Sequence, residues 1–431
     1  MIELKTGSKL PWHEDIKDLH RNWLFWKESY NVGPNYLDTK DERNNPVLKP
    51  FDCEDRINFK ERKKRTSPRN LVGRVVNQYV SAVFRNEPER DDRLGDLIVS
   101  ADGRGKSLSN TMKDSLQGTL IKNFSPILLE NRIGGVMSLA QAREAEQSIR
   151  ILNVDASAII NWTEIDGYLL DILVSFVDEE GKPFLRYYTD ETITDVFVDK
   201  KMERIESIGE PIPHGFSQIP VIIPNIELGG ESFVQPLAHS QSQITNYLSL
   251  LSQELYENCF TRFALGGIES LSNMTREERD NIQLEWGSKR LLMLPDSISV
   301  SRMASDKSQA DSIREAIVEE TEELFRNAGL IQDAVGMNAS GESRSLAREN
   351  FNMIARNMSQ TIEGAENKVI DLIGDVTGVE YEQSSYSESF AEFDYSEDIL
   401  QLRDILSLDL GSENDEIKGK AIEEFKNRYF I

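Results

Sequence analysis

The stretch NASGESRSLARENFNMIARNMSQTIEGAENKVIDLI, residues 338–373, decides the fold of this 431-residue chain. After a small polar opening, apolar residues recur three and four positions apart, which is the period of one helix face. They are Ala347, Phe351, Ile354, Met358, Ile362, Ala365, Val369, Leu372 and Val376. The pattern predicts one helix of about 30 residues, longer than the usual helix of a globular protein.

The loop before this helix, GMNASGES at 336–343, has the glycine spacing of a phosphate-binding loop. Such a loop needs a lysine after its second glycine to reach the phosphates, but Glu342 stands there and would repel them. It should also follow a buried strand, whereas residues 311–328 have helical apolar spacing, at Ile313, Ala316, Ile317, Leu324 and Ala328. We therefore reject a nucleotide site and predict a loop between two helices.

Length and charge narrow the class of protein. A chain of 431 residues exceeds a single ordinary core, so two or three modules, or one elongated subunit, are expected. A net charge of −25 argues against sequence-specific DNA binding and against binding to membrane surfaces, since both usually need basic faces. A protein that lets nucleic acid pass without adhesion remains compatible with it.

Targeting and redox signals are weak. No apolar run approaches the roughly 18 residues of a membrane span. The opening MIELKTGSKLPWHED lacks the apolar core of a signal peptide, so we expect synthesis and use in a cytosol, without a membrane partner. Cys53 and Cys259 lie far apart without a second cysteine nearby, which predicts structural thiols and neither a disulfide framework nor a zinc site.

Two helices are predicted near the N-terminus. Residues 16–30 place apolar side chains on one face, and residues 68–85 do the same, with Pro68 as a first-turn proline after Ser67. Between them the basic run Lys60 to Arg65 has two interpretations, a solvated segment before the helix or a nucleic-acid patch. The absence of interleaved aromatic residues favours the solvated segment.

The predicted secondary structure changes twice in the middle of the chain. Residues 151–226 contain short β-branched and aromatic runs separated by turn signals, which predicts an antiparallel sheet. Residues 236–262 then predict a long helix, with Leu237, Ile244 and Leu251 repeating at seven. Residues 263–308 predict a small αβ unit, inserted before a second, acidic helix.

This order resembles that of the portal proteins of tailed bacteriophages. The segments that carry the resemblance are SPRNLVGRVVNQYVSAVF at 67–84, FVQPLAHSQSQITNYLSLLSQELYENC at 233–259 and, above all, residues 338–373. The implied fold is α+β and mainly α, an elongated subunit that assembles into a ring. It divides into an N-terminal helical wing (1–150), a β-rich wing module (151–232), a first stem helix (233–262), an αβ clip (263–308), a second stem helix (309–330), a tunnel loop (331–345), a long wing helix (346–377) and a C-terminal crown-like segment (378–431).

The resemblance also implies a function. Portal proteins form a ring of about twelve copies at one capsid vertex. Terminase packages DNA through this channel, the DNA later leaves through it, and head–tail adaptors attach to it. The implied partners are other copies of the chain, the terminase large subunit, the capsid or scaffold protein, an adaptor and duplex DNA bound without sequence specificity. The implied location is the virion, after assembly in the bacterial cytoplasm, with no cofactor and no catalytic residue.

Three sets of residues receive roles from the resemblance. The tunnel loop would present Gly336, Met337, Asn338, Ala339, Ser340, Gly341 and Glu342 to the channel. The clip would use Lys289, Arg290 and Arg302 for terminase or adaptor contacts, although these could equally be ordinary surface charges. The channel wall would carry Glu315, Glu319, Glu322 and Glu323. Residues 311–326 hold six carboxylates against two arginines, and such a wall repels phosphate.

An enzyme or metal protein and a helical scaffold are the alternatives to a portal-type subunit. Glu315, Glu319 and Glu323 could suggest a carboxylate metal site, but that chemistry wants a histidine three residues after a glutamate, and His13, His20, His214 and His239 lie elsewhere. No G-x-S-x-G or H-E-x-x-H motif indicates an enzyme. The nearer alternative is a non-enzymatic helical scaffold or adaptor without a channel. A ring subunit would bury Leu237, Ile244 and Leu251 partly across subunits, and an adaptor would bury them within one chain.

Overall fold

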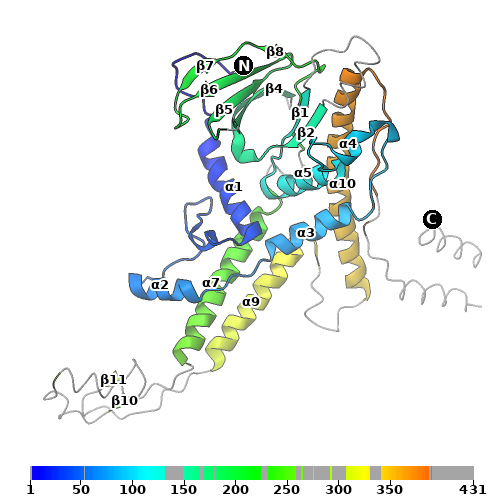
Figure 1. Ribbon diagram of the computed structural model, residues 1–431. Coiled ribbons are helices and arrows are strands. Elements are labelled where there is room, and N and C mark those ends of the chain that lie inside the picture. Colours follow the sequence, from blue (N-terminus) through cyan, green and yellow to red (C-terminus); the bar gives the residue numbers. More distant parts are fainter. Residues whose placement is uncertain are drawn as a thin grey trace, which may run out of the picture. The chain divides into compact units, whose positions relative to one another are not determined.

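The computed structural model describes residues 2–52, 54–131, 149–165, 168–178, 180–224, 232–258, 264–265, 275, 292–293, 307–330, 341–387 and 390. Within these ranges lie eight α-helices and eleven strands, and the fold is α+β with helix predominating, as the sequence predicted (Figure 1). The helices and strands all belong to one compact unit, Met1–Glu388.

The helices follow the predicted order. They are α1 (Ile16–Asn31), α2 (Arg56–Arg65), α3 (Val72–Val83), α4 (Asp96–Val99), α5 (Leu108–Lys122), α7 (Gln235–Asn258), α9 (Lys307–Asn327) and α10 (Gly341–Thr377), with short 3-10 turns at Tyr36–Asp38, Asp92–Leu94 and Ala156–Ala158. The prediction for residues 16–30 is confirmed by α1. The long C-terminal helix is confirmed too, although α10 begins at Gly341 and so takes up part of the predicted tunnel loop.

The start of α3 differs from the prediction. Pro68 lies before the helix rather than in its first turn. The backbone N–H groups of Leu71 and Val72 donate to Oε1 of Gln241 on α7, at 2.8 and 2.9 Å, so a side chain from a distant helix caps this one. The predicted apolar face is confirmed, since Val72, Val75, Val76, Tyr79 and Val83 are fully buried.

The predicted antiparallel sheet is also present. Its order is β3-β4-β5-β6-β7, with β8 paired to β6. The strands are β3 (Ile159–Ile165), β4 (Tyr168–Val177), β5 (Pro183–Tyr188), β6 (Thr192–Val198), β7 (Ile205–Ile208) and β8 (Ile212–Pro213). Side chains alternate across it, so Ile172, Val174 and Tyr188 enter one apolar cluster while Leu173, Leu185 and Val196 enter another.

A second, three-stranded sheet has the order β2-β1-β9, from β1 (Ile127–Asn131), β2 (Ile149–Asn153) and β9 (Val221–Ile222). Strand β9 lies within residues 151–226, but it is an edge strand of this second sheet rather than part of the larger one. Strand β1 lies inside the part predicted as a purely helical wing. Its run of Ile127, Leu128 and Leu129 is too short to distinguish a strand from a buried helix turn by periodicity.

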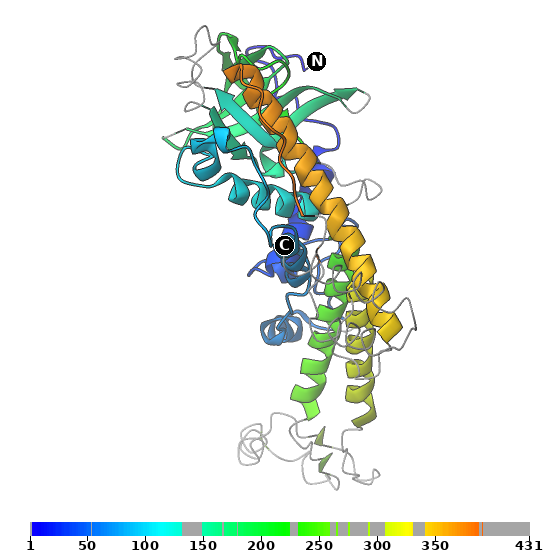
Figure 2. The same ribbon diagram turned by 90° about the vertical axis from the view of Figure 1, so that its right-hand side faces the viewer.

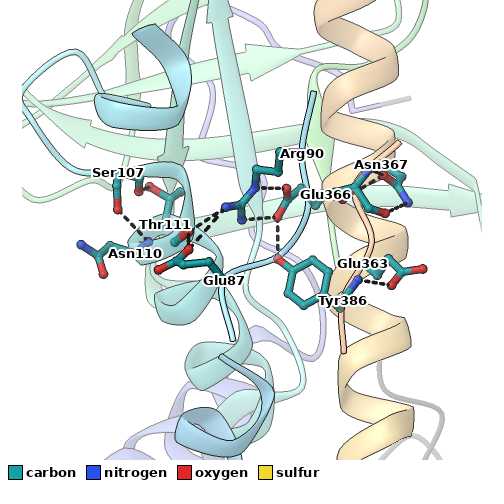
Figure 3. Close-up of polar contacts among 11 residues, drawn as sticks. Glu87, Arg90, Ser107, Asn110, Thr111, Glu363, Glu366, Asn367 and Tyr386 are labelled. Carbon is teal, nitrogen blue, oxygen red and sulfur yellow. Dashed lines mark hydrogen bonds and ion pairs between the residues drawn. The ribbon is translucent and has the colours of Figure 1, made fainter. Parts of the chain in front are cut away.

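Helix α10 is attached to the rest of the unit by a buried polar cluster (Figure 3). Arg90 donates two hydrogen bonds to the Glu366 carboxylate at 2.6 and 3.0 Å, and one to Oγ of Ser109 on α5 at 2.7 Å. The hydroxyl of Tyr386, in the segment after α10, donates to the same carboxylate at 2.5 Å. Glu366 is fully buried, so these partners compensate its loss of hydration.

Candidate functional site

Helices α7 and α9 form the hairpin to which the sequence analysis assigned the stem. They lie side by side in both views (Figures 1 and 2). Helix α9 buries Ile317, Leu324 and Phe325, and Ala328, the residue after its end, is buried too. In the chain between the two helices, β10 (Ala264–Leu265) pairs in parallel with β11 (Leu292–Met293), within the residues predicted to form a small αβ unit.

The N-terminal half of α7 is buried within the single chain. Leu237 and Ile244 are each 1% exposed, and Gln241 is fully buried. Besides capping α3, Gln241 donates through Nε2 to the backbone oxygen of Ser29 at 2.8 Å. Leu251 is only half-buried. The burial of Leu237 and Ile244 within one chain is what we expected of an adaptor. The half-buried Leu251 could still be covered by a neighbouring subunit.

The C-terminal half of α7 has less cover. Leu255 and Tyr256 are 42% and 46% exposed. What covers this half on the side away from α9 is α2, whose Arg65 donates to Oε1 of Gln253 at 2.6 Å and stacks over the ring of Tyr256 at 4.2 Å.

The basic run is itself a helix, which corrects its interpretation as a solvated segment before a helix. Arg62 is 1% exposed. Its guanidinium donates to both carboxylate oxygens of Glu54 at 2.7 and 2.8 Å, to Oγ of Ser249 on α7 at 2.8 Å and to the backbone oxygen of Lys49 at 2.7 Å. These hydrogen bonds hold the pKa of the Glu54 carboxyl below its ordinary value. Arg62 thus anchors α2 to α7, and the basic run alone does not indicate which of its cations has this role.

The four carboxylates predicted for a channel wall all lie on α9, away from its buried face. Glu315 and Glu319 are exposed, and Glu322 and Glu323 are half-buried. Arg314 pairs with Asp311 at 2.7 Å and Arg326 with Glu323 at 2.5 Å, one helical turn apart in each case. Among the described residues, no cation pairs with Glu315, Glu319 or Glu322. The surface that these three share is therefore strongly negative.

A shallow hollow interrupts this acidic surface, and the sequence analysis did not find it. It has a volume of about 400 Å³ and is lined by Arg314, Glu315, Val318, Glu319 and Glu322. Val318 is 47% exposed at the hollow. The one available signal was that Val318 falls outside the apolar spacing of α9, where a charged side chain is the usual choice.

The four histidines make packing and hydrogen-bonding contacts in separate parts of the fold. The rings of His13 and Trp162 stack at 3.9 Å, and burial is the main factor that lowers the pKa of both His20 and His214. His239 approaches Oε2 of Glu42 at 3.2 Å. Within the described ranges, no three histidine, cysteine or acidic side chains converge in a way that could hold a metal ion.

Several predicted residues lie outside the described part of the chain. They are Gly336, Met337, Asn338, Ala339 and Ser340 of the loop, Lys289, Arg290 and Arg302 of the clip, and Cys259; Cys53 is also outside it. Gly341 and Glu342 are the first two residues of α10. No helix in the described ranges combines the length and apolarity needed to span a membrane.

No family model matches the chain, and no curated protein matches it. Among solved structures it is similar to a chain of the neck of a native gene transfer agent (GTA) particle computed with C12 symmetry, with TM-score 0.44, 12% identity and coverage of 97% of this chain and 96% of that chain. A chain of the native GTA virion and one of the empty-particle neck computed with C6 symmetry give TM-scores of 0.46 and 0.47, each at 12% identity with 96% of both chains covered.

Proposed function

We propose that this chain is a structural component of a phage-like virion, and more specifically the subunit of a portal-type ring through which DNA is packaged and ejected. The observation that carries the proposal is the α7–α9 hairpin. Two long packed helices are separated in the chain by a paired β10–β11 element and followed by a Gly/Ser loop and the 37-residue α10. A generic helical scaffold has no need of an insertion at that point.

The charge on α9 supports the channel part of the proposal. A duplex that slides through a ring must not adhere to its wall, and unpaired carboxylates repel phosphate over about 10 Å at ordinary salt. In this proposal Glu315, Glu319, Glu322 and Glu323 form the channel wall, with Glu323 partly neutralised by Arg326. The small residues of 336–341, whose last glycine begins α10, would give the duplex few side-chain contacts. Terminase or an adaptor would meet the residues between α7 and α9, including Lys289, Arg290 and Arg302.

The decisive experiment is electron microscopy of the purified chain, together with measurement of particle mass in solution. The expected result is rings with a central hole wide enough for a duplex, at the mass of about twelve chains. Monomers or dimers at high concentration would contradict the proposal.

The loop has a separate test in a packaging reaction. Replacing Gly336 and Gly341 by Phe should leave ring assembly unchanged and reduce DNA packaging, because bulky side chains would narrow the channel. Replacing both by Ala is the matched control, since it adds only one methyl group at each position. Unchanged packaging with the Phe variant would contradict the tunnel assignment.

A scaffold or adaptor without a channel is the second candidate function. The burial of Leu237 and Ile244 within one chain favours it, because a self-sufficient subunit buries its seam without neighbours. It predicts discrete monomers or dimers in the same measurement, so the two candidates are separated by one experiment.

A further inference from the structure

Helix α2 presents an outward face that its attachment to α7 does not explain. Ile57 is 75% exposed, although it lies on a helix held rigidly by the buried Arg62. Lys60 and Lys64 follow Ile57 by three and seven residues, which places them within about 60° of it around the helix. This face therefore has an apolar centre and a net positive charge, because Glu61, about 40° around the helix from Ile57, offsets one of the two lysines.

The two lysines are available for a partner. Lys64 pairs with Glu61 at 2.8 Å, but both side chains are more than half exposed, and such pairs contribute little. Within the described part of the chain, Lys60 makes no ion pair. The other cations of the run are already used, since Lys63 pairs with Asp38 and Arg65 contacts Gln253.

Helix α9 carries the complementary pattern. The exposed Val318 has Glu315 three residues before it and Glu322 four residues after it, within about 60° around the helix. These residues line the hollow of about 400 Å³ described above. One helix thus offers an apolar side chain beside Lys60, Lys64 and Glu61, with a net positive charge. The other offers a recess at Val318 lined by three glutamates and Arg314, with a net negative charge.

The two surfaces belong to one chain, but α7 separates them. Helix α2 contacts α7, and α9 contacts α7 from the other side (Figure 1). We propose that the Ile57 face of α2 docks into the Val318 hollow of α9 on a second copy of this chain, with Lys60 and Lys64 against Glu315 and Glu322. Different surfaces on the two copies make this a head-to-tail contact, which closes into a ring when the rotation between copies permits.

The inference rests on the proposed ring and adds the contact between neighbours. It also divides the acidic face of α9 between two tasks. Glu319 also lines the hollow, so Glu323, about 140° around the helix from Val318, is the one of the four wall carboxylates that lies clear of the contact and remains available to a channel. Glu315 and Glu322 are instead neutralised by Lys60 and Lys64 of the neighbouring copy. The same contact covers the exposed Val318.

Disulfide crosslinking tests this contact directly. In a chain with Cys53 and Cys259 replaced by Ser, the substitutions Ile57→Cys and Val318→Cys are introduced singly and together. Facing cysteines can bridge only when their Cβ atoms approach within about 4.5 Å. Mild oxidation should convert the double variant into a ladder of covalent multimers, whereas each single variant should stay monomeric on a denaturing gel.

Each alternative outcome is informative when particle mass is measured on the same samples. Dimers from Ile57→Cys alone would mean that α2 faces α2, which overturns the inference. Rings without a ladder would overturn the inference and leave the proposed function intact. A monomeric chain without crosslinks would overturn both.

A charge exchange provides the second measurement. Lys60→Glu and Glu315→Lys should each raise the concentration needed for assembly by about tenfold or more, because each places like charges across the contact. The double variant should restore most of the lost assembly. Glu349→Lys, an exposed position on α10, is the matched control and should leave assembly unchanged. No rescue in the double variant would contradict the pairing.

Discussion

The two halves of α7 share one helix and one sevenfold apolar repeat, yet they have different surroundings. In the N-terminal half, Leu237 and Ile244 are buried by α1, α3 and the segments around them. In the C-terminal half, α9 and α2 are the main cover, and Leu255 remains 42% exposed. The comparison shows that a repeat establishes which side chains share a face, whereas the cover of that face depends on which other elements reach it.

The largest expected effect concerns α2 and the C-terminal half of α7. Arg62→Met should lower the free energy of opening α2 by about 3–5 kcal/mol, because the buried Glu54 carboxylate loses its paired charge. Hydrogen exchange of the α2 amides measures this opening. Lys60→Met removes an exposed charge from the same helix and is the control. Equal protection in both variants would mean that Arg62 does not fasten α2.

The next effect tests the two halves of α7 against each other. Ile244→Ala should lower the free energy of unfolding by about 3 kcal/mol, since it leaves a cavity in a closed core. Leu255→Ala removes a side chain of the same size from a half-exposed position and should cost less than about 1 kcal/mol. Urea denaturation of both variants gives the comparison. Similar losses would show that the two halves are equally enclosed.

A smaller effect is expected at the polar contact that joins α7 to α3. Gln241→Leu keeps the volume but removes the acceptor for Leu71 and Val72 and the donor to Ser29. We expect a loss of about 2 kcal/mol in the free energy of unfolding, because buried backbone groups are left without partners. Gln241→Glu retains the acceptor for the α3 amides but loses the donor to Ser29, so it should recover the lost free energy of unfolding only in part.

The smallest effect is a dependence on pH. The pKa of Glu54 is lowered in the folded chain, so its contribution is present above the ordinary glutamate value near 4.3 and is lost as the pH falls through the folded value. Protection factors of α2 amides should therefore decrease on acidification below about pH 4. In Arg62→Met this decrease should vanish, because an unpaired buried carboxyl gains from protonation. A decrease of the same size in both proteins would exclude Glu54 as its source.

Local patterns predicted much of this fold. The periodicity that defined α1, α3, α7, α9 and α10 survives in the structure because each helix has one face covered by its neighbours. The alternation in residues 151–226 likewise predicted the antiparallel sheet. Boundaries were less predictable, since the start of α3 depends on Gln241, a residue about 170 positions away along the chain.

For the candidate site, the sequence by itself determined which side chains share the acidic face of α9, because spacing along a helix fixes the direction in which each side chain points. It could not determine that Val318 lies at a hollow, that Arg62 is buried against Ser249, or that α2 and α9 lie on opposite sides of α7. Those facts depend on the packing of segments far apart in the chain. Side chains become buried or ion-paired only when such segments pack together. Tertiary structure alone therefore decided which charged groups are paired within the chain and which stay exposed to a partner.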